Sequence, residues 1–594
     1  MKTGQPTRPE APPTEESLFD QPAVSEAPQP AQPSPEQIPE SQPDSRVAEG
    51  AILESLVSLG FVNFDGNVGD NTTTSALVAE DRRRHFKRDV YVGIRDHEQQ
   101  LEFLGRVVEG PFHAPHEIGP DTAITRTTVL HPDRTRFRPT YYVHGSIEVM
   151  GQLESGDRLV PTPTRPRPYS EIYIFPSHRL QSLLGIEGNY HIGELMGYVG
   201  VPVKADVDNK NFLPRNVGVF GTVGSGKSNT TQVLMEEAVD AGWAVVAIDV
   251  EGEYVRMDEP NDRRDLNDIL QTRYGLTPGG VGDFRVYVPA SGHSEAADPS
   301  RFKVPIAAFQ PEVMAEILEF SEPQIRMFGA LTEAAKKAGG RKPKRMGALS
   351  GRGEPEAESR LYNLQDLIDG LGETDDGATT LLGKLRDAEK STAGALRSKL
   401  IGLGRTQMMD WGATQKTNEL PVMDLLVGGR LSVLDVSETG DRERNLAIAY
   451  TLQALFDQVI ETAVGEKMPN GQRRPKVLVV IEEVHTFVSR ASVGRMRAVL
   501  DNLQIITRRG RKRWMALSLV SQQPGHVPDE LFELANTRFI HQLKSAVNLA
   551  PVKATTGGVH EALWSTAVTW SGSMPSYRGH VQESPFRERA TGQV

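Results

Sequence analysis

Largely apolar runs, several of which end in polar residues, recur along the chain from residue 217 onward. They occupy residues 217–220, 243–249, 431–436, 477–481 and 515–520, with a weaker run at 537–543. A strand that is covered on both faces is apolar throughout, whereas a strand with one face in water alternates. Segments with helical spacing follow several of these runs, at 229–238, 442–463 and 496–508. The alternation predicts an α/β core with a doubly wound parallel sheet.

Between residues 261 and 424 this alternation is interrupted. Helical patterns occupy residues 311–320, 324–338, 361–371 and 391–403. We expect an inserted helical subdomain at 261–424, which divides the core into 199–260 and 425–594. A glycine-rich basic loop at 339–345 is either a solvated linker or a contact to DNA in a channel.

The first third of the chain has a different pattern. Short β-rich runs separated by turn residues occupy 75–78, 89–94, 101–108, 140–149 and 171–175. Strands at this spacing predict a small barrel or sandwich at 50–198. The basic run at 82–88 is either a solvated edge or a contact to nucleic acid or a partner. Residues 1–49 are rich in Pro, Gln and Glu and have few large apolar side chains, so we expect a disordered tail.

Composition and charge narrow the function classes. The chain has 594 residues and a formal net charge of −12, half of which lies in residues 1–49. The rest is only mildly acidic, so local basic surfaces for DNA remain possible. The absence of cysteine excludes disulfides, thiolate metal sites and cysteine nucleophiles. The N-terminus has no signal-peptide pattern and no run of about 18 apolar residues occurs, so we expect a cytoplasmic protein without a membrane span.

The run at 217–220 leads into a glycine-rich loop. Gly221 to Ser228 fits G-x-x-x-x-G-K-[ST], and a helical pattern follows. Strand, loop and helix in this order indicate a phosphate site, in which backbone N–H groups and the helix N-terminus surround the phosphates of ATP. Lys227 would contact the β- and γ-phosphates, and Ser228 would bind Mg²⁺. The expected nucleotide-binding residues are Gly221, Thr222, Val223, Gly224, Ser225, Gly226, Lys227, Ser228 and Asn229.

Two acids follow the run at 477–481. Glu482 stands where P-loop ATPases usually have an acid associated with Mg²⁺, and Glu483 is placed to orient and polarise the attacking water. The alternative is that the two carboxylates merely end a strand. Adjacent acids repel each other unless a cation lies between them, which favours Mg²⁺–ATP. His485 is expected to be structural, because no metal-ligand pattern surrounds it.

Two further segments carry candidate chemistry. Gln522 directly follows the run at 515–520, and its amide could sense the γ-phosphate; otherwise it belongs to a polar turn. The basic run at 507–513 offers Arg508 and Arg511 as candidates for stabilising the transition state at a neighbouring subunit's nucleotide. The alternatives for this run are phosphate contacts with DNA and a solvated turn.

Taken together, these motifs resemble the HerA family of hexameric DNA translocases, in the HerA/FtsK branch of P-loop ATPases. The matching segments are Gly221–Thr230, Ile248–Tyr254, Ile481–His485, Arg508–Lys512, Ser521–Pro524 and Ala535–Arg538. The resemblance covers residues 200–594, and it accounts for 50–198 as a HAS-barrel-like domain by position and character. Two departures are Glu482, where the family usually has Asp, and Asn216, where His is common.

The resemblance implies a RecA-like P-loop core, a homohexameric ring with double-stranded DNA in its channel, and a nuclease or other effector as partner. We therefore expect an ATP-driven DNA translocase or helicase in DNA-end processing or phage defence. One alternative is an ATP-gated ring that recruits and activates an effector without processive movement. Another is a secretion-type protein translocase, although the basic loops and the lack of an anchor do not favour it.

Overall fold

The computed structural model describes residues 57–64, 72–115, 123, 130, 141–154, 158–195, 197–198, 200–339, 362–373, 379–410, 418–491 and 497–556. The expected tail at 1–49 and nearly all of the basic loop at 339–345 lie outside these residues. Within the described ranges, no helix combines the length and the apolar character that crossing a bilayer requires.

Residues 58–174 form a closed antiparallel barrel. Its strands are β1 (Ser58–Val62), β2 (Thr73–Val78), β3 (Tyr91–Asp96), β4 (Leu101–Pro115), β5 (Tyr141–Glu154) and β7 (Glu171–Ile174). The order β2-β1-β7-β3-β4-β5 closes because β2 also pairs with β5, while β6 (Arg158–Val160) is added outside β5. Of the two predicted forms, the structure has the barrel. The basic run at 82–88 falls mainly in η1 (Glu80–His85), a 3₁₀ helix without buried residues, rather than on a strand edge.

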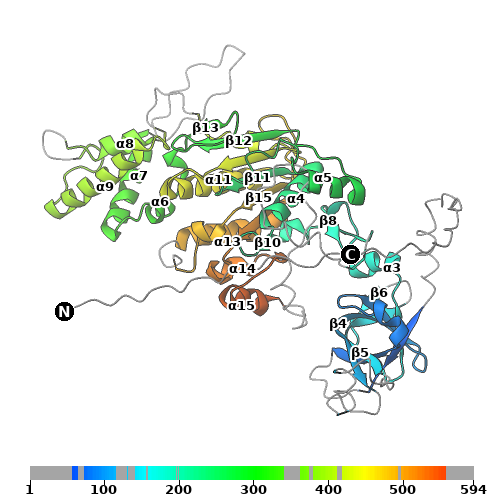
Figure 1. Cartoon of the computed structure of the whole chain (residues 1–594). Helices are drawn as coiled ribbons and strands as arrows, with labels where there is room; N and C mark the ends of the chain where they lie inside the picture. The colour runs from blue at the N-terminus through cyan, green and yellow to red at the C-terminus, as the bar shows by residue number, and fades with distance from the viewer. Residues whose placement is uncertain are drawn as a thin grey trace, which may run out of the picture. The chain divides into compact units, whose positions relative to one another are not determined.

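The second sheet has eight strands, and all of them are parallel. Its order is β13-β12-β14-β11-β15-β16-β10-β17 (Figure 1). The strands are β10 (Val217–Phe220), β11 (Ala244–Asp249), β12 (Phe284–Pro289), β13 (Ser300–Phe302), β14 (Leu431–Asp435), β15 (Val477–Ile481), β16 (Met515–Ser521) and β17 (Thr537–Ile540). The predicted doubly wound parallel core is confirmed.

Both faces of this sheet are covered, as the largely apolar runs require. On β11, Val245 and Ala247 belong to one hydrophobic cluster, and Val246 and Ile248 belong to the other. Helix α4 (Lys227–Asp240) packs on the first face, and α11 (Asp441–Glu461) and α13 (Arg497–Gly510) pack on the second (Figure 1). The sheet is therefore the middle layer of three.

The range 261–424 differs from its prediction as a helical insertion. Two strands of the central sheet, β12 and β13, lie inside it. Its helices are α5 (Arg264–Ile269), η3 (Leu270–Tyr274), η4 (Ile306–Ala308), α6 (Pro311–Ile317), α7 (Glu322–Gly339), α8 (Leu364–Gly370), α9 (Asp387–Arg405) and α10 (Val422–Leu425). Buried residues of α6 to α9 join the same hydrophobic cluster as the sheet's second face, so the insertion shares the core of the ATPase domain.

The remaining elements are short. They are α3 (Ser177–Leu184), β8 (Tyr190–Glu194), β9 (Pro202–Ala205), η2 (Leu213–Arg215), α12 (Val484–Phe487), η5 (Arg511–Arg513), η6 (Pro524–His526), α14 (Asp529–Phe532) and α15 (Ala546–Thr555). β8 and β9 form a separate antiparallel pair.

One edge of the central sheet collects the functional segments. Parallel strands end at the same edge, so the residues that follow β10, β11, β15, β16 and β17 come together there. β16 lies between β10 and β15, and β11 lies on the other side of β15. The glycine loop after β10, the acids after β11 and β15, and the glutamine turn after β16 therefore meet at this edge.

Candidate active site

The glycine loop connects β10 to α4, which begins at Lys227. Gly224 and Gly226 have φ values of 70° and 93°, in the left-handed region that favours glycine. Lys227 is buried, and its Nζ lies 3.3 Å from the carbonyl oxygen of Thr222. Strand, loop and helix thus have the arrangement that a phosphate site needs.

Lys227 faces a group of carboxylates. Burial lowers the pKa of its ammonium group, and the nearby charges of Glu483, Glu253, Glu251 and Glu482 oppose that shift. The carboxylates therefore favour the charged form of this buried ammonium group, which is the form that contacts a phosphate. The structure therefore brings together the predicted Lys227, Glu482 and Glu483.

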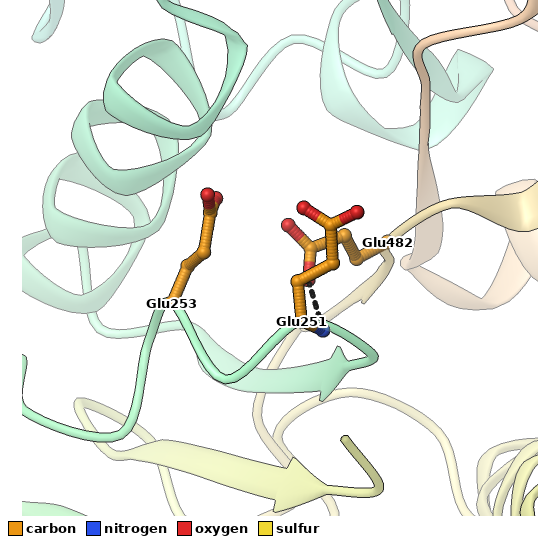
Figure 2. A group of neighbouring side chains, drawn as sticks. All are labelled: Glu251, Glu253 and Glu482. Carbon is orange, nitrogen blue, oxygen red and sulfur yellow. Dashed lines mark hydrogen bonds between the residues drawn. The ribbon is translucent and has the colours of Figure 1, made fainter. Parts of the chain in front are cut away.

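Three of these acids form a compact oxygen-lined group. Glu251, Glu253 and Glu482 each place one carboxylate oxygen within 4.8 Å of the others (Figure 2). Glu482 is buried, and one of its oxygens, Oε2, accepts hydrogen bonds from the backbone N–H groups of Val250 and Glu251 at 3.2 and 3.3 Å. The Tyr254 hydroxyl donates to its other oxygen at 3.1 Å. Of these three acids, only Glu482 is a predicted Mg²⁺ ligand.

A second buried acid stands behind this group. Asp249 accepts hydrogen bonds from the N–H groups of Gly252, Glu253 and Tyr254 and so fixes the turn that carries the exposed Glu251 and the half-buried Glu253. Burial raises the pKa of Asp249 to about 6. Burial also raises the pKa of Glu482 well above its ordinary value, and the charge of Asp249 adds to that shift.

This donor set fits a hard divalent cation. Mg²⁺ prefers oxygen ligands, and a cation would relieve the repulsion between carboxylates held this close. Glu482 could bind it directly or through water, together with Glu251 or Glu253. The side chain of Glu482 is longer than that of the aspartate usual in the family. Its hydrogen bonds hold it against the turn after β11.

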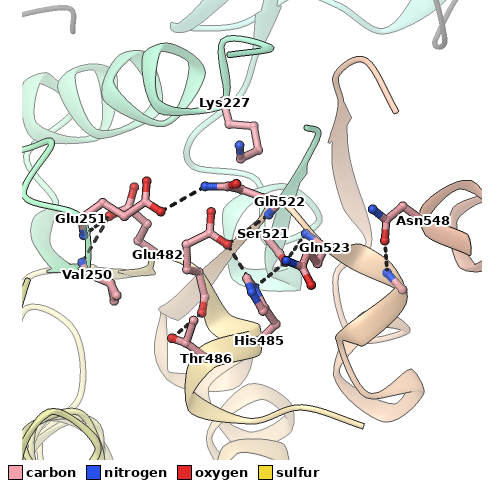
Figure 3. Close-up of polar contacts among 12 residues, drawn as sticks. Lys227, Val250, Glu251, Glu482, His485, Thr486, Ser521, Gln522, Gln523 and Asn548 are labelled. Carbon is pink, nitrogen blue, oxygen red and sulfur yellow. Dashed lines mark hydrogen bonds and ion pairs between the residues drawn. The ribbon is translucent and has the colours of Figure 1, made fainter. Parts of the chain in front are cut away.

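Glu483 lies on a sharp turn at the end of β15. Its φ and ψ are 42° and 49°, an uncommon conformation for a residue with a side chain. Its buried carboxylate accepts from the N–H of Gln522 at 3.1 Å and lies 3.0 Å from Nδ1 of His485. The same ring nitrogen is 3.1 Å from the Ser521 hydroxyl (Figure 3). His485 was expected to be structural, and the structure places it against the proposed water-orienting group.

Gln522 bridges the glutamine turn and the acid group. Its side-chain amide donates to Glu251 at 3.1 Å (Figure 3). Its backbone N–H donates to Glu483. Ser521 supports the turn from within, because its hydroxyl accepts from the N–H of Gln523 at 3.0 Å. Gln522 therefore contacts both parts of the acidic site, and its predicted role as a sensor of the γ-phosphate stays a prediction.

Arg508 and Arg511 are not brought to this site. Arg508 is exposed near the end of α13, and Arg511 donates to Asn211 at 3.2 Å from η5, directly before β16. The glycine loop lies at the other end of the sheet, where Phe220 pairs with Ser521. The length of β16, about 20 Å at roughly 3.3 Å per residue, separates these arginines from the loop of the same chain.

Asn216 replaces the usual histidine of the family and has a clear local role. Its side-chain oxygen accepts from the N–H of Leu517 at 3.0 Å, and its amide donates to the carbonyl of Leu534 at 3.3 Å. It therefore ties the start of β10 to β16 and to the segment before β17.

A glycine loop between strand and helix, an acid pair on a nearby strand and a glutamine on the strand between them define a P-loop ATPase. Residues 190–455 match the family model of the HerA helicase central domain. The predicted resemblance of this chain to the HerA family is confirmed over these residues. It is an ATPase.

Relatives extend the likeness beyond the central domain. The DNA double-strand break repair helicase HerA of Pyrococcus furiosus is 24% identical over 67% of this chain and 68% of its own length. The protein of the same name from Saccharolobus solfataricus is 21% identical over 61% of this chain and 60% of its own. Among solved structures, VirB4 of Thermoanaerobacter pseudethanolicus aligns with 67% of this chain and 97% of its own at 13% identity, with a TM-score of 0.40.

Proposed function

We propose that this ATPase is a motor that moves along double-stranded DNA as a homohexameric ring. The observation that carries the proposal is the joining of Lys227, Glu482, Glu483 and Gln522 in one site of a chain that resembles the HerA family. The relatives named as double-strand break repair helicases support DNA as the track. Their names also favour a role in DNA-end processing, in which a nuclease or other effector would act with the ring.

Each residue of the site has a proposed task. Lys227 and the N–H groups of the glycine loop would hold the phosphates of ATP, and Ser228 and Glu482 would hold Mg²⁺. Bound Mg²⁺–ATP supplies the transferable phosphoryl group and the charge that polarises it. Glu483, held by Gln522 and His485, would orient a water and take its proton.

A Glu483→Gln variant tests this assignment. It keeps the size of the side chain but removes the base, so we expect ATP to bind normally and turnover to fall by roughly 10² to 10⁴. Binding is measured with a fluorescent nucleotide, and turnover by phosphate release with and without duplex DNA. Glu530→Gln, on the exposed surface of α14, is the matched control. Full hydrolysis by Glu483→Gln would remove Glu483 from the mechanism.

We propose that each nucleotide site of the ring is completed by an arginine from the neighbouring subunit. The candidates are Arg508 and Arg511. Lys227→Ala and Arg508→Ala chains should each be inactive alone, since each lacks one half of a shared site. An evenly mixed ring would contain complete sites at about a quarter of its interfaces, so mixing should restore part of the activity. The same experiment is run with Arg511→Ala, and the exposed Arg509→Ala is the control. No recovery with either arginine would contradict the shared site.

DNA as the substrate has its own test. Contacts to phosphates carry no base sequence, so stimulation of the ATPase should be similar for unrelated duplexes and should weaken steeply with salt. If no form of DNA stimulated hydrolysis, the motor would need a different track, such as a polypeptide.

A further inference from the structure

The residue after β17 lies directly beside the glycine loop. β17 pairs in parallel with β10, with Ile540 opposite Phe220. The N–H of His541 donates to the carbonyl of Phe220 at 2.7 Å, which continues that pairing by one step. His541 is therefore placed by the sheet itself next to Gly221, the first residue of the loop.

The ring of His541 makes two hydrogen bonds to the phosphate-site elements. Nδ1 lies 2.9 Å from the carbonyl oxygen of Ser225, and Nε2 lies 3.0 Å from the hydroxyl of Thr230 on α4. The Ser225 carbonyl can only accept, so Nδ1 carries the hydrogen. Nε2 then accepts from the Thr230 hydroxyl in the neutral ring. The side chain is 5% exposed, so water does not compete for either bond.

The Ser225 carbonyl is the part of the loop whose direction matters. A phosphate-binding loop turns its N–H groups inward, and its carbonyls must point away and find donors elsewhere. Ser225 lies between Gly224 and Gly226, both in the left-handed region, so its peptide groups are not fixed by a regular element. The ring of His541 supplies the missing donor.

The next residue braces the other side of the loop. The carbonyl of Gln542 accepts from the N–H of Thr222 at 2.9 Å and from its hydroxyl at 3.1 Å. Gly221 lets this segment approach closely, because a Cβ there would lie 2.5 Å from the Cβ of His541. The contacts of residues 541–542 thus hold the loop at three points.

We propose that His541 is a positioning residue for nucleotide binding and hydrolysis, whose neutral ring holds the Ser225 carbonyl and the Thr230 hydroxyl so that the loop keeps its phosphate-binding conformation. The inference rests on the proposed phosphate-binding role of the loop. It gives the end of β17 a role in supporting the glycine loop, which neither the glycine motif nor the acid pair predicts.

Four variants separate the two hydrogen bonds. His541→Asn can keep the donor to Ser225, because its amide lies where Nδ1 lies, but it loses Thr230. His541→Gln can reach Thr230 but not Ser225. His541→Leu loses both, and Thr230→Val removes one hydroxyl without touching the ring. His293→Asn, on an exposed histidine, is the control. For each, the Kd of a fluorescent ATP analogue, KM, kcat and the unfolding midpoint are measured without DNA.

We expect His541→Leu to raise the Kd and KM by roughly tenfold or more, and His541→Asn to remain closer to wild type than His541→Gln. A shift in Kd at an unchanged unfolding midpoint is something that simple packing would not produce. If His541→Leu does not fold, the order of the Asn and Gln variants decides the question. Wild-type affinity in His541→Leu, or equal affinity in the Asn and Gln variants, would overturn the inference. Failure of the wild-type chain to bind the analogue would instead overturn the proposed function.

Discussion

Acidification should destabilise the ATPase core through His541. Burial lowers the pKa of this ring from 6.5 to about 4, and the charge of Lys227 acts in the same direction, against the hydrogen bond to Ser225. Between these pH values the unfolded chain binds a proton at this site and the folded chain does not. The contribution to stability is therefore fully present above pH 6.5 and is lost as the pH falls to about 4.

The magnitude follows from the size of the shift. A difference of about 2.5 pKa units at about 1.4 kcal/mol per unit gives a contribution of about 3.5 kcal/mol at neutral pH. Other groups titrate in this range as well, so the useful quantity is the difference between the wild type and His541→Asn. The asparagine cannot titrate, and the curves of the two proteins should converge as the pH falls.

The assay is urea unfolding at several pH values between 7.5 and about 4.5, followed by tryptophan fluorescence, to which the buried Trp243 beside β11 contributes. Midpoints are compared rather than a single free energy, because a chain with two folded domains does not unfold in one step. If the unfolding midpoints of the wild type and His541→Asn ran parallel over the whole pH range, the reasoning would be refuted, because the histidine would then not be buried in its neutral form.

Three further predictions concern the site and its support. Gly221→Ala should abolish nucleotide binding in a folded chain, because its Cβ would lie 2.5 Å from that of His541, whereas Gly279→Ala meets nothing within 4 Å and should be neutral in the same binding assay. Phe532→Ala should lower the free energy of unfolding by about 3–5 kcal/mol, because the Phe532 ring stacks on Phe220 at 4.6 Å in the core. The more conservative Phe532→Leu is the control, and an equal loss of stability in the two variants would contradict this reasoning. Chelation of divalent cations should stop phosphate release, and turnover that persists would exclude the acids as a cation site.

The strongest strands could be predicted from the sequence because burial on both faces leaves a local signature. β15 is apolar throughout, β11 is apolar up to its last residue, Asp249, and β16 has two serines among apolar residues; the structure buries every residue in the three strands. β12 and β13 lack this signature, because Arg285 interrupts one and the other is only three residues long at the sheet edge. The place of β12 in the sheet depends on pairing with β14, more than 120 residues further along the chain, and β13 pairs with β12; local sequence does not contain that information.

The residues of the candidate site also divide into those that the sequence could predict and those that it could not. Glu482, Glu483 and Gln522 could be selected because each directly follows a recognisable strand. Glu251 and His541 could not, since their importance comes from sheet order: β11 lies beside β15, and β17 lies beside β10. Their one local signal is that each is a polar side chain just after a strand, β11 for Glu251 and β17 for His541.

The position of the arginine cluster has a structural consequence for assembly. In a parallel sheet, the nucleotide edge and the opposite edge are separated by the whole strand, and η5 lies at the opposite edge, directly before β16. An arginine there can serve a nucleotide only if a second copy presents that edge to the first copy's glycine loop. Such an interface joins two different surfaces, and repetition of it closes into a ring or continues as a filament. Arg508 and Arg511 therefore link two proposals, since a failed mixing experiment would weaken the ring as well as the shared site.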